Sequence, residues 1–181
     1  MSEYSVKVVK QNSDRNDRRD FVKMMTVFRE KYFNKQSPFD YNLENFSHIL
    51  DTRKDIVCGL LSKQSNNVGI FEYVYGRLGN MPLASLGTLY IQPKHRSRGL
   101  SKEFYELCYK TFEQQNIAFC IHIEESKFLG NEKRFWDLGF THYIIINEFD
   151  SDSQYKEKTY ALFRKPYYKV LLPIQVESLY N

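Results

Sequence analysis

The stretch Leu89-Tyr90-Ile91-Gln92-Pro93-Lys94-His95-Arg96-Ser97-Arg98-Gly99-Leu100-Ser101 decides the fold of this chain. It opens as an apolar strand, and Pro93 ends that strand at Ile91 because proline cannot donate a hydrogen bond to a sheet. A basic turn follows and leads directly into a helix. The sequence therefore predicts a strand, a turn and a helix in immediate succession.

The basic turn and the helix start have the properties of an anion-binding site. The first backbone N–H groups of a helix lack intrahelical acceptors, and the helix dipole adds partial positive charge there. Gly99 lets the backbone approach a ligand closely, and Ser101 is small enough to leave the approach open. Four cationic side chains lie around them: Lys94, Arg96, Arg98 and Lys102. This combination fits a diphosphate, and its alternative is a solvated helix entry with only a capping role.

Downstream of the turn, apolar spacing predicts a helix, a strand, a short helix and a hairpin. The helix covers about residues 100–115, and one face carries its apolar side chains: Leu100, Phe104, Leu107, Cys108 and Phe112. Ile117–Ile123 is a near-continuous apolar run, typical of a strand buried on both faces. The remaining elements are a helix at Asn131–Leu138, stopped by Gly139, and strands at Tyr143–Phe149 and Thr159–Arg164.

Upstream, the pattern predicts a strand, two helices and three strands joined by hairpins. The elements are Ser5–Val9, a helix ending near Tyr32, Asn42–Leu50, Ile56–Leu61, Val68–Tyr75 and Leu86–Ile91. Turn residues at Ser65–Asn67 and Gly76–Pro82 separate the three strands. The order β-α-α-β-β-β-α-β-α-β-β predicts a single α+β domain with a mixed, mostly antiparallel sheet.

The composition is that of a globular protein. The chain has 181 residues, 42% hydrophobic and 27% charged, with a net charge of +4. No apolar run is long enough to span a membrane, and the N-terminus does not resemble a signal peptide. We expect one domain over residues 1–166. The apolar tail, residues 167–181, is expected to pack on this domain or on a partner subunit, so a homodimer stays open.

The cysteine count indicates the compartment. Cys58, Cys108 and Cys120 are odd in number and lack CxxC spacing, which argues against a disulfide framework and a zinc site. All three lie in apolar stretches, as expected for small buried side chains in a reducing cytoplasm. We therefore expect a cytoplasmic protein without a metal site.

The decisive stretch resembles the acyl-CoA-binding motif of the GCN5-related N-acetyltransferase (GNAT) superfamily. That motif is Arg or Gln, two residues, Gly, one residue, then Gly or Ala, and here it reads Arg96-x-x-Gly99-x-Ser101. Ser101 departs mildly from the pattern. Ile91-x-Pro93 and Leu138-Gly139-Phe140 are further features typical of the family. The resemblance covers the element order from about Tyr4 to Lys165.

The resemblance implies a splayed sheet that binds acyl-CoA and an activity that transfers its acyl group to an amine. The pantetheine would lie alongside Leu89, Tyr90 and Ile91, and a backbone N–H near Ile91 would polarise the thioester carbonyl. Main-chain N–H groups would hold the pyrophosphate across Arg96, Ser97, Arg98, Gly99, Leu100, Ser101 and Lys102. The acceptor would be a small molecule or peptide with a primary amine, and the co-substrate acetyl-CoA or another acyl-CoA.

The positions that often carry catalytic groups in this family are filled differently here. Ser85 and Gly87 occupy the slots of the usual Glu or His base, and Phe135 occupies that of the usual Tyr acid. Phe128 stands where an Asn often contacts CoA. Other groups are therefore candidates for proton transfer: Glu72 or Tyr73, Glu124 or Glu125, and Tyr143.

Two alternatives that need none of these side chains stay open. In the first, proton removal passes through water, and positioning supplies most of the rate. In the second, the domain binds acyl-CoA without transferring its acyl group. His122 lies in an apolar strand and is expected to be a hydrogen-bonded core residue.

Nucleic-acid binding through Lys94–Lys102 is disfavoured, because a charge of +4 gives little electrostatic attraction and no zinc or RNP-type motif is present.

In the family, the acceptor site lies between the first two helices and the later hairpin. The matching segments here contain aromatic residues and carboxylates, which suit a cationic amine. These residues are Phe33, Phe39, Asp40, Tyr41, Glu44, Glu148, Asp150 and Asp152.

Overall fold

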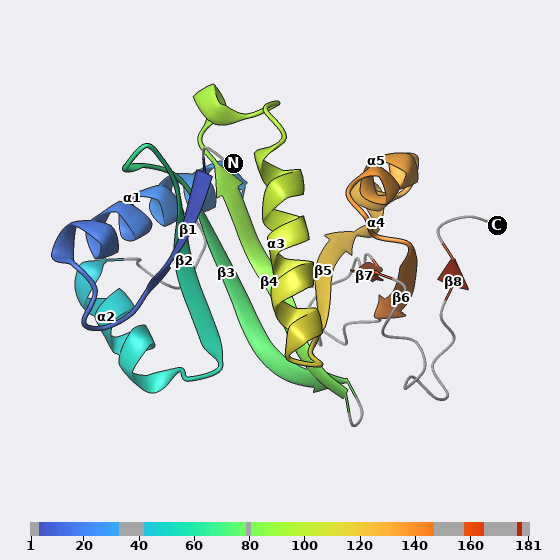
Figure 1. Ribbon diagram of the computed structural model, residues 1–181, viewed down its shortest axis with the longest axis horizontal. Coiled ribbons are helices and arrows are strands. Elements are labelled where there is room, and N and C mark those ends of the chain that lie inside the picture. The colour runs from blue at the N-terminus through green and yellow to red at the C-terminus, as the bar shows by residue number, and fades with distance from the viewer. Residues whose placement is uncertain (1–3, 33–41, 79–80, 147–157, 165–176, 179–181) are drawn as a thin grey trace. The chain divides into compact units, whose positions relative to one another are not determined.

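The computed structural model describes residues 4–32, 42–78, 81–146, 158–164 and 177–178. The first elements in chain order are β1 (Tyr4–Val9), α1 (Arg15–Tyr32), α2 (Leu43–Thr52), β2 (Ile56–Lys63), β3 (Asn66–Leu78) and β4 (Met81–Ile91). The next are η1 (Pro93–His95), α3 (Leu100–Gln114), β5 (Ala118–Glu124), α4 (Glu125–Phe128) and α5 (Glu132–Asp137). The last are β6 (His142–Ile146), β7 (Thr159–Phe163) and β8 (Glu177–Ser178) (Figure 1).

The strands form a mixed sheet in the order β1-β2-β3-β4-β5-β7-β6-β8. The pairs β1–β2, β2–β3, β5–β7, β6–β7 and β6–β8 are antiparallel, whereas β4 and β5 are parallel. The predicted α+β class and mostly antiparallel sheet are therefore confirmed. The chain groups into an N-terminal unit, Met1–Val74 with Gly87–Leu100, and a C-terminal unit, Tyr75–Leu86 with Ser101–Asn181. Strands β3 and β4 run through both units.

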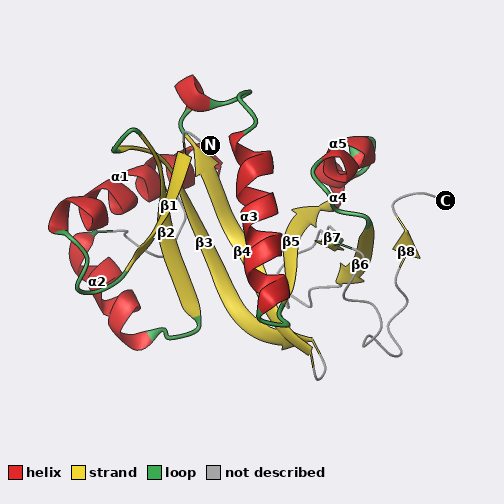
Figure 2. Ribbon diagram, in the orientation of Figure 1, coloured by secondary structure: helices red, strands yellow, loops and turns green. Residues whose placement is uncertain are grey.

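In the N-terminal unit, α1 and α2 bury their apolar faces against β2 and β3 (Figure 2). Phe21 of α1 and Phe46 of α2 are fully buried, and their rings stack with centroids 4.6 Å apart. Gly59 in β2 is required by close packing, because a Cβ there would lie 2.1 Å from the ring of Phe71. The ring of Phe71 thus leaves no room for a side chain at position 59.

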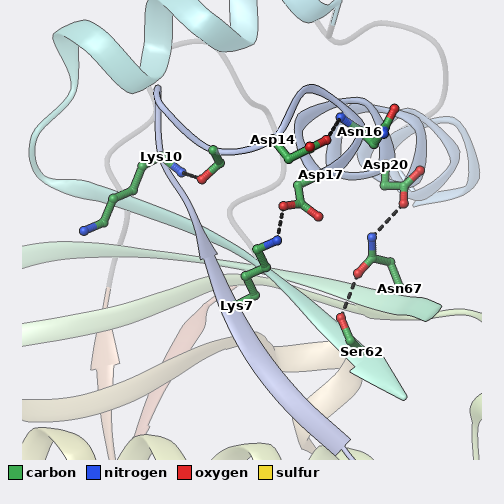
Figure 3. Close-up of polar contacts among 9 residues, drawn as sticks. Lys7, Lys10, Asp14, Asn16, Asp17, Asp20, Ser62 and Asn67 are labelled. Carbon is green, nitrogen blue, oxygen red and sulfur yellow. Dashed lines mark hydrogen bonds and ion pairs between the residues drawn. The ribbon is translucent and has the colours of Figure 1, made fainter. Parts of the chain in front are cut away.

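Polar contacts also hold α1 on the sheet (Figure 3). Lys7 of β1 forms an ion pair with Asp17, near the start of α1. One turn later, Asp20 accepts a hydrogen bond of 2.6 Å from Nδ2 of Asn67, and Oδ1 of Asn67 accepts one of 2.7 Å from the Ser62 hydroxyl. These contacts link one face of α1 to β1, β2 and β3.

In the C-terminal unit, α3 packs on β5 through aromatic rings. Phe119 of β5 stacks on Phe112 and meets Tyr109 edge-on, with ring centroids 5.5 Å apart in both pairs. Phe140 completes the cluster at 5.6 Å from Tyr109. Because strand residues alternate between faces, Cys120 lies on the opposite face of β5, where it packs with residues of β6 and β7.

Several predicted details were wrong. The hairpin between β2 and β3 turns at Gln64 and Ser65, whose φ angles are +47° and +68°, rather than at Ser65–Asn67. Both β3 and β4 extend into the predicted turn Gly76–Pro82. The side chain of Leu107 is 45% exposed, so it lies outside the apolar face of α3.

Other expectations are met or fall outside the described residues. The three cysteines are free and buried. Within the described ranges, no helix is long and apolar enough to cross a membrane. The predicted acceptor-site residues, Glu44 excepted, and the tail segment Val170–Val176 lie outside the described residues.

Candidate functional site

The predicted succession of strand, turn and helix is present. Strand β4 ends at Ile91, where the backbone N–H of Gln92 still donates to Val68 O at 2.9 Å. The short helix η1 then reverses the chain, and its proline stands at the first helical position. Residues 96–99 lead into α3, which begins at Leu100 and runs for 15 residues.

Arg96 fastens the turn to the strand that precedes it. Its Nε donates a 2.8 Å hydrogen bond to the backbone oxygen of Ile91. Its guanidinium lies over the ring of Tyr90, with Cζ 5.6 Å from the ring centroid. Tyr90 is itself buried and packs against Phe28 of α1. The motif arginine therefore has a structural role in addition to its charge.

The backbone between Arg96 and α3 is open and has an unusual conformation. Ser97 and Gly99 have φ angles of +58° and +78°, and both residues are exposed. A Cβ added at Gly99 would meet nothing within 4 Å. Leu100 is buried and anchors the helix start, so the first N–H groups of α3 are held in place. Such turns, with alternating signs of φ before a helix, form cradles for anions.

Cationic side chains surround this cradle. Lys94, Arg98 and Lys102 are exposed. Partial burial, together with the charges of Lys94, Arg98 and Lys63, lowers the pKa of His95 below its ordinary value. Two of these three cations, Lys94 and Arg98, belong to the segment between β4 and α3 itself.

A cavity of about 450 Å³ borders the turn within the N-terminal unit. Its walls come from one face of α1 and from the end of β4, and its lining residues are Asp20, Lys23, Met24, Val27, Tyr90, Gln92, Pro93 and Lys94. Ligand sites are commonly hollows of this size that combine apolar walls with a few polar groups. The basic turn thus has space beside it for part of a ligand.

The carboxylate of Glu72 lies beside Gly87, one of the two positions where the family often has a base. Its Oε1 is 3.8 Å from the position that a Cβ would take at Gly87. On the other side, Cys58 lies opposite Glu72 in the β2–β3 ladder, with Sγ 3.9 Å from Oε2. Burial and the charge of Glu72 raise the pKa of Cys58, so that thiol stays neutral. A carboxylate from β3 thus lies beside the position where the resemblance implies one on β4.

His122 is placed differently from its prediction. It is exposed rather than part of the core, and its Nε2 lies 3.3 Å from Oγ of Ser85. Only the first four residues of β5, Ala118–Ile121, form a fully buried run, and the strand then alternates. The alternation of polar and apolar residues in His122-Ile123-Glu124 is the sequence feature that could have indicated an exposed imidazole.

Two further catalytic candidates, Glu124 and Tyr143, lie in the C-terminal unit. Glu124 is exposed and forms an ion pair with Lys127. Tyr143 is half-buried and packs against both Phe128 and Tyr160, with ring centroids 5.4 and 5.3 Å away. Phe135, in the slot of the usual tyrosine, is buried. Tyr143 and Phe135 both contact Phe128, whereas Glu72 belongs to the N-terminal unit.

No protein-family model matches the sequence, and no curated protein matches it. Solved structures do match its fold. A variant of the spermidine N-acetyltransferase SpeG from Vibrio cholerae has a TM-score of 0.63 at 12% identity, over 90% of this chain and 94% of that one. An N-acetyltransferase from Staphylococcus aureus has a TM-score of 0.62 at 11% identity, over 89% and 96%. An aminoglycoside acetyltransferase from an uncultured soil sample has a TM-score of 0.56 at 12% identity, over 74% and 85%.

The chain therefore has the fold of the GNAT acetyltransferases. The similarity extends over nearly the whole length of the two N-acetyltransferases.

Proposed function

We propose that this chain is an acyl-CoA-dependent N-acyltransferase that acylates a primary amine of a small molecule or a peptide. The observation that carries the proposal is the open, electropositive turn 96–99, which leads from β4 into the N-terminus of α3 in a chain with this fold. Fold alone does not define activity, so the proposal depends on this turn. Two of the neighbours named above are a spermidine and an aminoglycoside acetyltransferase, and both kinds of molecule are amines.

The residues of the turn suit the diphosphate of coenzyme A. The N–H groups of Leu100, Ser101 and Lys102 open α3 and have no intrahelical acceptor. The space around Gly99 admits phosphate oxygens, and Arg98 and Lys102 supply charge. Leu89, Tyr90 and Ile91 would lie along the pantetheine, as the resemblance implies.

The reaction requires proton transfer at two atoms. A primary amine is protonated at neutral pH and must lose one proton before its nitrogen attacks the thioester carbonyl carbon. As the C–N bond forms and the C–S bond breaks, the nitrogen loses a second proton and the sulfur gains one. Of the predicted candidates for proton transfer, Glu72 is favoured as a proton acceptor because its carboxylate lies beside β4. Glu124 and Tyr143 remain candidates for the second role.

Acetyl-CoA binding tests the first half of the proposal. The wild-type protein is expected to show a higher melting temperature with acetyl-CoA or CoA at millimolar concentration. Gly99→Glu is expected to abolish the shift, because the new carboxylate would repel phosphate. Gly99→Ala is the control for backbone strain, and Gly76→Glu adds the same charge at another exposed position with free space. Absence of any shift in the wild type would refute acyl-CoA binding.

A non-catalytic acyl-CoA-binding module is the second candidate function. It is favoured by Ser85, Gly87 and Phe135, which leave the usual catalytic positions without a base or an acid. Release of the CoA thiol from acetyl-CoA across a panel of primary amines separates the two functions. Any amine-dependent turnover excludes the binding module.

The free, buried cysteines also fit the reducing cytoplasm in which we place the protein.

A further inference from the structure

The cavity between α1 and the end of β4 has a lining that combines both signs of charge with apolar side chains. One stripe of α1 forms the first wall, with residues three and four apart as on a single helix face: Asp20, Lys23, Met24 and Val27. The second wall comes from residues 90–94 and consists of Tyr90, Gln92, Pro93 and Lys94. All eight residues belong to the N-terminal unit. The volume of about 450 Å³ suits a small molecule.

Contacts between the two walls show how they run past each other. Gln92 donates from Nε2 to Met24 Sδ at 3.4 Å, and the ring of Tyr90 packs on that of Phe28, one turn further along α1. Tyr90 therefore lies nearer the C-terminus of α1 than Gln92 does. Asp20 is one turn before Met24, so the cavity has an Asp20 end and a Tyr90 end.

The Asp20 end offers two oxygen acceptors within one hydrogen-bonded group. Nδ2 of Asn67 donates to Asp20 Oδ2 at 2.6 Å (Figure 3), and the backbone oxygen of Asn67 accepts from Nε2 of Gln92 at 3.5 Å. Among the described residues, Asn67 is the one partner of the Asp20 carboxylate, so Oδ1 is available to a ligand. The side-chain oxygen of Gln92 likewise accepts no hydrogen bond within the described ranges. An ammonium group has three N–H donors and can use both oxygens.

Two lysines supply the opposite charge. Lys23 follows Asp20 by three residues on α1, and Lys94 follows Gln92 by two residues. Both are exposed, and in the part of the chain that the structure describes neither pairs with a carboxylate. A carboxylate in the cavity can therefore pair with the lysines without displacing an existing ion pair.

The Tyr90 end is apolar. Met24 and Tyr90 are buried, whereas the side chain of Val27 is 43% exposed. An aliphatic group placed against Val27 would remove apolar surface of both from water. The cavity thus offers acceptors for an ammonium group, cations for a carboxylate and a surface for an aliphatic chain.

We propose that this cavity binds an α-amino acid with an aliphatic side chain. The ammonium group donates to Asp20 Oδ1 and to the side-chain oxygen of Gln92. The carboxylate pairs with Lys23 and Lys94, and the aliphatic chain lies at the Tyr90 end. The inference concerns binding alone: it does not depend on the proposed acyltransferase function, and it does not require that the amino acid be acylated.

Isothermal titration calorimetry of the full chain with L-leucine tests the proposal. Three further probes each lack one feature of L-leucine: isocaproic acid lacks the ammonium group, isoamylamine lacks the carboxylate, and free glycine lacks the side chain. L-leucine should bind in the millimolar range or more tightly. Each of the other probes should bind at least about 10-fold more weakly, because each leaves groups of the cavity without a partner.

Two variants remove charges from the cavity and keep its shape. Asp20→Asn retains an oxygen to accept from Asn67, and Lys23→Met retains an apolar stem. Each should weaken L-leucine binding by about 10-fold. Lys10→Met is the matched control, because Lys10 is an exposed lysine of the same unit outside the cavity lining, and it should bind L-leucine as the wild type does. Unchanged melting temperatures of the unliganded variants separate loss of the site from loss of folding.

Several outcomes would overturn the amino-acid site. They are absence of L-leucine binding by the wild type, equal affinity in Asp20→Asn, Lys23→Met and the wild type, and isocaproic acid binding as tightly as L-leucine. Loss of L-leucine binding at saturating CoA would assign the cavity to acyl-CoA and would also overturn it. Failure of CoA itself to bind would overturn the proposed function and leave the amino-acid site standing, so the two failures are distinguishable.

Discussion

Arg96 shows how one side chain can serve both structure and binding. Its Nε donates a hydrogen bond to the backbone oxygen of Ile91, and its guanidinium lies over the ring of Tyr90. Lysine has neither the planar fork nor the stacking surface needed to make both contacts. The arginine of the motif therefore keeps the end of β4 and the anion cradle in a fixed relation.

The first prediction compares two arginines of the turn. Arg96→Lys should lower the free energy of unfolding by about 1 kcal/mol, because a hydrogen bond and a cation–π contact are lost. Arg98 is exposed, so Arg98→Lys should change stability by less than about 0.5 kcal/mol. Urea titrations of both variants provide the measurement. Equal losses in the two would contradict the fastening role of Arg96.

The second prediction concerns His95 and pH. Its pKa in the free protein lies below the ordinary value, since partial burial and the charges of Lys94, Arg98 and Lys63 disfavour the imidazolium. A bound diphosphate neutralises part of that charge and should raise the pKa. Binding then takes up a proton, so affinity for CoA should increase as the pH falls from 7 to about 6. NMR titration of the His95 ring with and without CoA measures the shift, and a lower pKa in the complex would count against the cradle.

At the scale of elements, the start of α2 depends on a single cap. The side chain of Asn42 accepts a 2.8 Å hydrogen bond from the backbone N–H of Asn45. Asn42→Ala should therefore lower the free energy of unfolding by about 1 kcal/mol, whereas Asn42→Ser should retain most of the stability. Chemical denaturation of the two variants gives the comparison. Equal stability of Asn42→Ala and the wild type would show that the cap contributes nothing.

Elements that depend on local signals were predictable, and the others were not. The succession of β4, turn and α3 follows from one proline, one glycine and a long helical period. Helix α4 has four residues, too few to show a period, so it was missed. The turn at Gln64 and Ser65 was misplaced because neither residue is a glycine, although both have positive φ.

The candidate site was predictable only in part, for a related reason. The anion cradle lies in one continuous segment, and the sequence predicts it. The pairing of Ser85 with His122 depends on the register between β4 and β5, which joins residues far apart in the chain. The position of Glu72 beside Gly87 likewise depends on how strands align. Sequence patterns indicate strands, whereas side chains that meet across them require the structure.

At the scale of the whole molecule, β3 and β4 belong to both units, so the units should unfold together. Phe21→Ala removes a fully buried ring from the N-terminal unit and should cost about 3–5 kcal/mol. Trp136, the only tryptophan of the sequence, lies in the C-terminal unit. In guanidinium titrations, Phe21→Ala should lower the unfolding midpoint measured by Trp136 fluorescence as much as the midpoint measured by circular dichroism. A Trp136 midpoint unaffected by Phe21→Ala would mean separate unfolding.

The burial of the three free thiols gives the protein internal reporters of its own fluctuations. Cys58, Cys108 and Cys120 lie on β2, α3 and β5, and burial raises the pKa of each thiol, to about 12 for the latter two. Because the thiolate is the reactive form, an alkylating reagent modifies each cysteine only during a transient opening. The alkylation rate at each thiol, resolved by peptide mass spectrometry, therefore measures how often that element opens. An unmodified sequence can thus report which elements become more rigid when acetyl-CoA is added.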